Sequence, residues 1–281
     1  MKIAHLSDLH FASCTWNPFH IFSKRWLGNL NFLFGRRHHF DHQRLVPLPK
    51  LLKSLGVSTV LITGDLSTTS SAAEFAQARK FVNTLEKEKL ETLCIPGNHD
   101  HYTRSAYRNR LFYDYFDSHW DKIIPYTLKK DGVAAKQLSS EWWLVGLDTA
   151  LATSWVHSTG YFHPKIEQAL SKILKQIPPN VQVVLMNHFP FFQHEAPRKR
   201  LVRGEALEAL IEKHPRIKIY CHGHTHRRCK ANLSASRLPL ILDTGSTPHW
   251  KQGGWYLIDL STISATFYEW NKNEWVANAL V

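Results

Sequence analysis

The sequence is poor in cysteine and has no long hydrophobic run. Its 281 residues include four cysteines, and no two of them form a Cys-x-x-Cys pair. This pattern argues against a disulfide framework and is typical of a protein from a reducing compartment. No stretch of about 18 apolar residues is present, so we expect no transmembrane helix. The first residues, MKIAHLSD, lack the pattern of a signal peptide. We therefore expect a cytoplasmic protein, free in solution or peripheral to a membrane.

Acidic residues are in the minority, which limits the class of partner. The chain has 35 lysines and arginines against 23 aspartates and glutamates, a formal net charge of +12. Such a balance favours anionic partners, namely phosphorylated substrates, anionic lipid surfaces or nucleic acid. Hydrophobic residues make up 43% of the chain, enough for a substantial core and too many for a disordered protein.

Short apolar runs alternate with helical patterns along most of the chain. This alternation predicts an α/β fold with a largely parallel or mixed sheet, followed by a C-terminal antiparallel sheet. No internal repeat or linker divides the chain, so we expect one domain over residues 1–281. The predicted strands are 2–6, 58–63, 91–95, 142–147, 181–186, 217–221, 238–242, 254–260 and 264–270, and the predicted helices are about 71–89, 104–117, 163–177 and 204–213.

Polar side chains follow five of these strands at the point where each strand ends. The segments are SDLH, TGDL, PGNHD, NHFP and GHTH. If the five strand ends meet at one edge, they gather aspartate, asparagine and histidine in one cavity. Imidazole and carboxylate oxygen are ligands for Mn, Fe or Zn. Six or seven ligands are too many for one catalytic ion, and they suit two ions that share a bridging carboxylate.

The ordered set DxH, GD, GNHD, H and GHxH resembles the calcineurin-like metallophosphoesterase family. The resemblance implies a four-layer α/β/β/α sandwich of two mixed β-sheets flanked by helices, with two divalent ions at its rim, Mn first and Fe or Zn as alternatives. It also implies that hydroxide bridging the ions attacks phosphorus. Carried over residue by residue, Asp8, His10 and His226 hold one ion, Asn98, His188 and His224 hold the other, Asp65 bridges both, and His99 is the catalytic histidine.

Two positions depart from the family pattern. Many relatives read GDxxD, and the second aspartate orients the catalytic histidine. Here Thr68 stands at that place, so His99 needs another partner or acts without one. His222, in the segment CHGHTH, stands where a small residue is usual, and it has no assigned role.

Two segments beside the metal motifs combine aromatic and basic residues. One is an insertion at about 14–42 and the other follows His188. This mixture suits an interfacial element over a lipid with an anionic head group. The alternatives are single-stranded nucleic acid or a nucleotide, which this mixture favours less than lipid, and a loop that packs its aromatic rings into the core. The candidate substrate-binding residues are Trp26, Arg36, Arg37, Arg198 and Arg200.

The sequence therefore predicts a metal-dependent phosphohydrolase that cleaves a phosphodiester or pyrophosphate bond. The favoured substrate is lipid-linked, of the UDP-2,3-diacylglucosamine type, with an anionic membrane surface as a possible partner. The alternatives are a cyclic-nucleotide or nucleotide phosphodiesterase and, without catalysis, a metal-holding scaffold. Nucleic acid is the less favoured partner, and the oligomeric state stays open.

Overall fold

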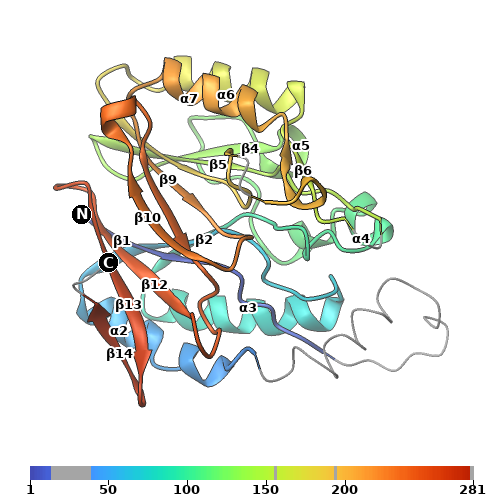
Figure 1. Cartoon of the computed structure of the whole chain (residues 1–281), viewed down its shortest axis with the longest axis vertical. Helices are drawn as coiled ribbons and strands as arrows, with labels where there is room; N and C mark the ends of the chain where they lie inside the picture. The colour runs from blue at the N-terminus through green and yellow to red at the C-terminus, as the bar shows by residue number, and fades with distance from the viewer. Residues whose placement is uncertain (14–38, 155–156, 193–194, 279–281) are drawn as a thin grey trace.

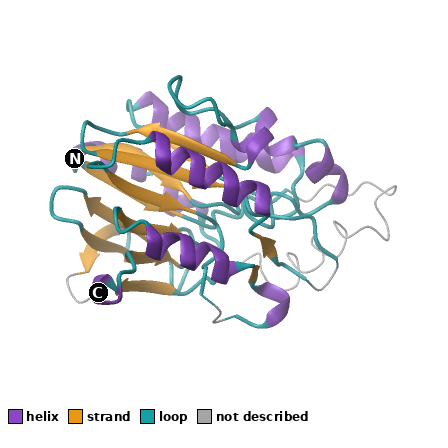
Figure 2. Ribbon diagram, turned by 90° about the horizontal axis from the view of Figure 1, so that it is seen from above, coloured by secondary structure: helices purple, strands orange, loops and turns teal. Residues whose placement is uncertain are grey.

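The computed structural model of the chain describes residues 1–13, 39–154, 157–192 and 195–278. Two six-stranded β-sheets pack face to face, and helices cover their outer faces (Figure 1). The four layers are therefore helix, sheet, sheet and helix, and Figure 2 shows the helices flanking the stacked strands from above. This is the predicted α/β architecture.

The first sheet has the order β14-β13-β12-β1-β2-β3. Its parallel part joins β1 (Lys2–Leu6), β2 (Val57–Ile62) and β3 (Glu91–Cys94). The antiparallel part joins β12 (Gly254–Asp259), β13 (Ser264–Asn271) and β14 (Glu274–Asn278) to the other side of β1. The expected separate C-terminal sheet was thus wrong, because β12 takes its hydrogen-bonding partner from the N-terminal strand.

The second sheet has the order β10-β11-β9-β7-β5-β4. At its centre β5 (Trp142–Leu147), β7 (Gln182–Met186) and β9 (Ile217–His222) run parallel. The flanking strands are β4 (Val133–Gln137), β11 (Leu240–Thr244) and β10 (Arg228–Asn232). A small pair, β6 (Gly160–Tyr161) with β8 (Leu201–Val202), lies apart from both sheets.

The helices lie on the outer faces because each has one apolar side. The first sheet packs on α2 (Leu48–Ser54) and α3 (Ala72–Lys87), through side chains such as Phe75 and Leu52. The second packs on α6 (Pro164–Gln176) and α7 (Gly204–Lys213), through side chains such as Leu170. The described residues also form two short helices, α4 (Arg104–Arg108) and α5 (Leu128–Asp131). Short 3-10 helices lie at His42–Leu45, Leu111–Asp114, Pro197–Lys199 and Ser234–Ser236.

Between the sheets lies a third apolar layer that includes Ile3, Leu61, Val184 and Ile219. These residues alternate along their strands with the ones that face the helices, so both faces of each sheet are buried. Burial on both faces explains why the strands read as continuous apolar runs. In the described part of the chain, no helix is long and apolar enough to cross a membrane.

Candidate metal centre

The loops after β1 and β2 continue the pairing of their strands. The backbone N–H of Asp8 donates to the carbonyl of Gly64 at 3.0 Å, and that of His10 donates to the carbonyl of Asp65 at 2.9 Å. This pairing sets the three side chains at one edge of the sheet. All three are buried, with at most 1% of their surface exposed.

One group of donor atoms gathers Asp8, His10 and His226. The Nε2 atoms of the two histidines are 3.0 Å apart, and Nε2 of His226 is 3.1 Å from Oδ1 of Asp8. With Asp65, the ligand atoms of these residues all lie within 4.8 Å of one another. The other oxygen of Asp8 accepts bonds from the hydroxyl of Ser7 and the backbone N–H of His224, which aims Oδ1 at the histidines.

A second group gathers Asn98, His188 and His224 from the loops after β3, β7 and β9. The Oδ1 atom of Asn98 lies 3.2 Å from Nε2 of His188 and 2.8 Å from Nδ1 of His224. The remaining nitrogen of each ring faces a carbonyl oxygen, that of Thr63 for His188 and that of Lys199 for His224. A histidine that donates one N–H to a carbonyl presents the lone pair of its other nitrogen, as metal-binding histidines do.

Asp65 stands between the two groups. Its Oδ2 atom is 3.8 Å from Nε2 of His10 in the first group and 3.5 Å from Nε2 of His188 in the second. Its Oδ1 atom accepts the backbone N–H of His99 at 2.7 Å. One carboxylate is thus shared by two clusters of nitrogen and oxygen donors.

A pair of divalent cations fits this donor set. The Nε2 atoms of the buried His10 and the partly exposed His226 lie 3.0 Å apart beside a carboxylate, and Nδ1 of His10 has no hydrogen-bond partner in the described residues. Burial lowers the pKa of His10 well below its usual value and that of His224 to about 3. Both rings are therefore neutral near pH 7, the form that binds metal. The histidines lower the pKa of Asp8 to about 2 against the effect of burial.

Five of the seven predicted ligands have left-handed backbone. The φ angle is positive at Asp8, His10, Asp65, His224 and His226, between 49° and 71°. Residues with a side chain rarely adopt this region, and such strain clusters at functional sites. No feature of the sequence predicted this backbone conformation.

Thr68, which stands where many relatives have an aspartate, holds His99 through its backbone. Its Nδ1 lies 2.7 Å from the carbonyl oxygen of Thr68, to which it donates. The backbone of Thr68 thus provides the acceptor that an aspartate side chain provides in many relatives. The ring makes an edge contact with that of His10, at 4.9 Å between centroids, and stacks on Tyr102.

The family model of the calcineurin-like phosphoesterases matches residues 1–228. The chain belongs to this family. Its fold agrees with solved structures of phosphatases. The structure of a dimetal phosphatase from Danio rerio superposes with a TM-score of 0.60 at 12% identity, covering 96% of this chain and 93% of that one. A purple acid phosphatase from yellow lupin gives 0.64 at 11% identity, covering 98% of this chain and 52% of that one.

A curated relative is a 3′,5′-cyclic-nucleotide phosphodiesterase from Nostoc sp. It is 25% identical over 173 residues, which cover 60% of this chain and 55% of the relative. The match therefore spans about half the length of that protein.

Around the ligands, further residues of this chain support the loops that carry them. Asp100 accepts backbone bonds from Gly97, Leu66 and Ser67 at 2.8–3.1 Å, and so ties the GNHD loop to the GDL loop. Asp243 on β11 accepts a bond from the hydroxyl of Thr225 at 2.6 Å, between the two ligand histidines. No strand-end motif marks Asp243, so only the sheet order could bring it here.

His222 is not among the donor atoms of either group. It is buried, its Nδ1 lies 3.3 Å from Oδ2 of Asp243, and its Nε2 has no partner in the described residues. Burial lowers its pKa to about 4. Of the three histidines in CHGHTH, His226 thus belongs to the first group of donors and His224 to the second, whereas His222 belongs to neither.

The structure describes only two of the five candidate substrate-binding residues. Trp26, Arg36 and Arg37 lie outside the described residues, as does most of the predicted insertion. Arg198 is exposed, and Arg200 donates from Nε to the carbonyl of Glu195.

Two described segments border the metal ligands. Lys199 contacts His224 through its carbonyl oxygen at 2.8 Å. At the end of the insertion, the Phe40 ring packs on that of His10 at 4.8 Å.

Proposed function

We propose that this chain is a dinuclear phosphodiesterase in which Asp65 bridges the two metal ions. The observation that carries the proposal is the position of Oδ2 of Asp65 between the two donor groups. On this assignment, the ions take the seven ligands named from the sequence: Asp8, His10, Asp65, Asn98, His188, His224 and His226. When bound, the ions supply Lewis-acid stabilisation of phosphoryl oxygens and a water of lowered pKa.

His99 is assigned the proton transfer to the leaving oxygen. Its backbone N–H is fixed on Oδ1 of Asp65 and its Nδ1 on the carbonyl of Thr68. The two bonds orient the ring, and Nε2 is the nitrogen that can give up a proton. A general acid so placed speeds departure of a poor leaving group and matters little for a good one.

For the substrate we favour a small soluble phosphodiester of the cyclic-nucleotide class. This assignment draws on the activity of the Nostoc relative and on the net charge of +12. A second candidate is a lipid-linked diphosphate such as UDP-2,3-diacylglucosamine. It is supported by the aromatic and basic composition of residues 14–42 and by the contact of the basic segment at Lys199 with His224.

A hydrolysis screen separates these candidates. Protein loaded with Mn is incubated with bis(p-nitrophenyl) phosphate, 3′,5′-cyclic AMP and UDP-2,3-diacylglucosamine. The proposal expects turnover of the first two at rates that fall when metal is removed with EDTA. Turnover of the lipid substrate alone would favour the second candidate. No turnover of any diester by protein that carries two ions would reject the phosphodiesterase assignment.

A further inference from the structure

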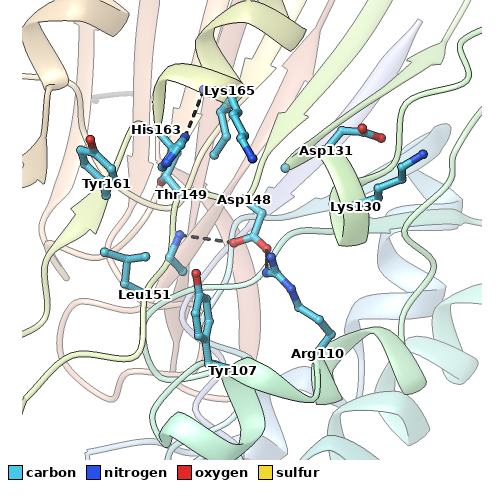
Figure 3. A pocket seen from close by; sticks show the side chains of 13 residues that line it. Tyr107, Arg110, Lys130, Asp131, Asp148, Thr149, Leu151, Tyr161, His163 and Lys165 are labelled. Atoms are coloured by element: carbon cyan, nitrogen blue, oxygen red, sulfur yellow. Dashed lines mark hydrogen bonds and ion pairs between the residues drawn. The ribbon is translucent and has the colours of Figure 1, made fainter.

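A second pocket, distinct from the metal centre, opens where β5 ends. It has a volume of about 260 Å³ and is lined from several elements: Tyr107 on α4, Arg110 after it, Lys130 on α5, Asp148 and Thr149 after β5, and Lys165 on α6. None of its lining residues is an assigned metal ligand. Figure 3 shows the basic side chains arranged around Asp148.

Arg110 is fixed in the wall of this pocket. Its Nη1 pairs with Oδ2 of Asp148 at 3.4 Å, and its guanidinium lies over the ring of Tyr107 at 5.1 Å. Its backbone is left-handed, with φ of 53°. Because only Nη1 takes part in the pair, the planar fork keeps further N–H donors of the kind that bind phosphate in a bidentate manner.

The charge of Asp148 is already balanced inside the protein. This buried carboxylate accepts a bond from the hydroxyl of Tyr113 at 2.6 Å, besides pairing with Arg110, and it lies 3.5 Å from Nε2 of His101. In contrast, Lys130 and Lys165 have no carboxylate at ion-pair distance in the described residues. Asp131 also lines the pocket, so its three basic and two acidic side chains leave an excess of one positive charge, to which the N-terminus of the 13-residue helix α6 adds.

Two contacts connect the pocket to the metal centre. Thr149 donates its hydroxyl to Oδ1 of Asn187 at 2.7 Å, next to the ligand His188. His101, which approaches Asp148, follows the GNHD loop directly. A ligand in the pocket would thus contact residues that support the metal centre, without occupying it.

We infer that this pocket binds the phosphate group of a small phosphorylated molecule, at Arg110, Lys130 and Lys165. Its volume is just below the usual range for a drug-sized ligand, which favours a small metabolite or free phosphate over a macromolecule. The two tyrosine rings that line it, Tyr107 and Tyr161, leave room for an organic part beside the phosphate.

The test compares two double variants by calorimetric titration of metal-loaded protein with inorganic phosphate. Lys130→Gln/Lys165→Gln removes the two unpaired cations of the pocket. Lys172→Gln/Lys175→Gln removes the same charge from exposed positions on α6 and serves as the control. We expect the pocket variant to bind phosphate at one site on the order of tenfold more weakly, because two charge contacts are lost. Its KM for bis(p-nitrophenyl) phosphate should stay that of the wild type.

A second arm removes the metal centre from the comparison. The Asp65→Ala variant should still bind phosphate once per chain, and the Lys130→Gln/Lys165→Gln changes added to it should weaken that binding by the same factor of about ten. The inference is overturned if the pocket variant binds phosphate as the control does, or if Asp65→Ala binds none. Since this arm needs no turnover, it separates failure here from failure of the proposed reaction.

Discussion

At the scale of the single residue, strained backbone concentrates at the donor atoms. Asp8, His10 and Asp65 are left-handed side by side, and each such residue costs on the order of 1–3 kcal/mol. The loops after β1 and β2 pair with each other and hold these residues there, for example through the bond from the N–H of His10 to the carbonyl of Asp65. Gly64 allows this approach, because a Cβ atom would lie 2.7 Å from Nδ1 of His188.

Asp65→Ala is expected to lose most of both metal ions. Its carboxylate is the one placed between the donor groups, at 3.8 Å from His10 and 3.5 Å from His188. Inductively coupled plasma mass spectrometry of purified protein measures the metal content, with the exposed Asp259→Ala change as a control. A variant that keeps two ions and normal turnover would show that the ligand scheme is wrong.

His99→Ala is expected to keep its metal and lose turnover by about 10²–10⁴-fold, the effect of a missing general acid. The loss should shrink for diesters with acidic leaving groups, which depart without a proton. Measuring kcat over a series of substituted phenyl esters tests this. An equal loss for every leaving group would instead assign the histidine to positioning of the phosphate.

At the scale of the element, the start of α3 holds the loop that carries Asp65. Ser71 and Glu74 form a capping box, and Glu74 is buried. Its Oε2 atom accepts the backbone N–H groups of Thr69 and Ser71 at 2.9 and 3.0 Å. Glu74→Ala should therefore lower the free energy of unfolding by about 1–3 kcal/mol, because buried donors lose their acceptor. Urea unfolding measures the loss.

The same glutamate should make stability depend on pH. Burial raises the pKa of Glu74 above its usual value of 4.5, although the N–H donors oppose this. The folded state therefore holds the proton more tightly than the unfolded state does. Its contribution is complete below the unfolded pKa and is lost as pH rises through the folded one. The Glu74→Gln variant has no proton to lose at this position. Its free energy of unfolding, measured with urea, should therefore rise relative to that of the wild type between pH 4 and pH 7. A constant difference would contradict this.

Asp243 is expected to position the loop that carries His224 and His226. It bonds to Thr225 between them, and burial raises its pKa well above the usual range. Asp243→Ala should weaken metal binding by about 10–100-fold, as loss of such a supporting bond does. Asp243→Asn keeps a neutral acceptor and should retain most of the affinity. Titration with a competing chelator measures both, and equal losses would reject the role.

At the scale of the whole molecule, the net charge of +12 acts together with the aromatic and basic segment at 14–42. If that segment contacts lipid, Phe22→Ser/Trp26→Ser should reduce binding to anionic liposomes. Each basic residue near the surface adds about 1 kcal/mol, which salt screens. Hydrolysis of a soluble diester should stay nearly intact. Sedimentation with liposomes and a soluble assay measure the two effects. Equal loss of both, with a lower melting temperature, would assign the segment to the core.

The sequence by itself predicted the α/β class and most of the strands, and the resemblance of its motifs to the family implied the four layers. Apolar runs with turn residues between them predicted nine strands that the structure contains, among them β1, β2 and β7. Five further strands in the described residues were missed because they are short or half-exposed and read as mixed sequence, namely β4, β6, β8, β10 and β14. The strand ends predicted that polar side chains gather at one edge, and the resemblance of the five motifs to the calcineurin-like family implied the seven candidate ligands.

Only the tertiary structure decided how these pieces combine. It paired β12 with β1 rather than placing the C-terminal strands in a sheet of their own, and it brought Asp243 under the histidine loop. It also gave His99 a carbonyl acceptor at Thr68, where the pattern lacks an aspartate. Sheet order, left-handed backbone and backbone acceptors depend on contacts between residues far apart in the chain. Such contacts leave no local periodicity or spacing, so a single sequence does not reveal them.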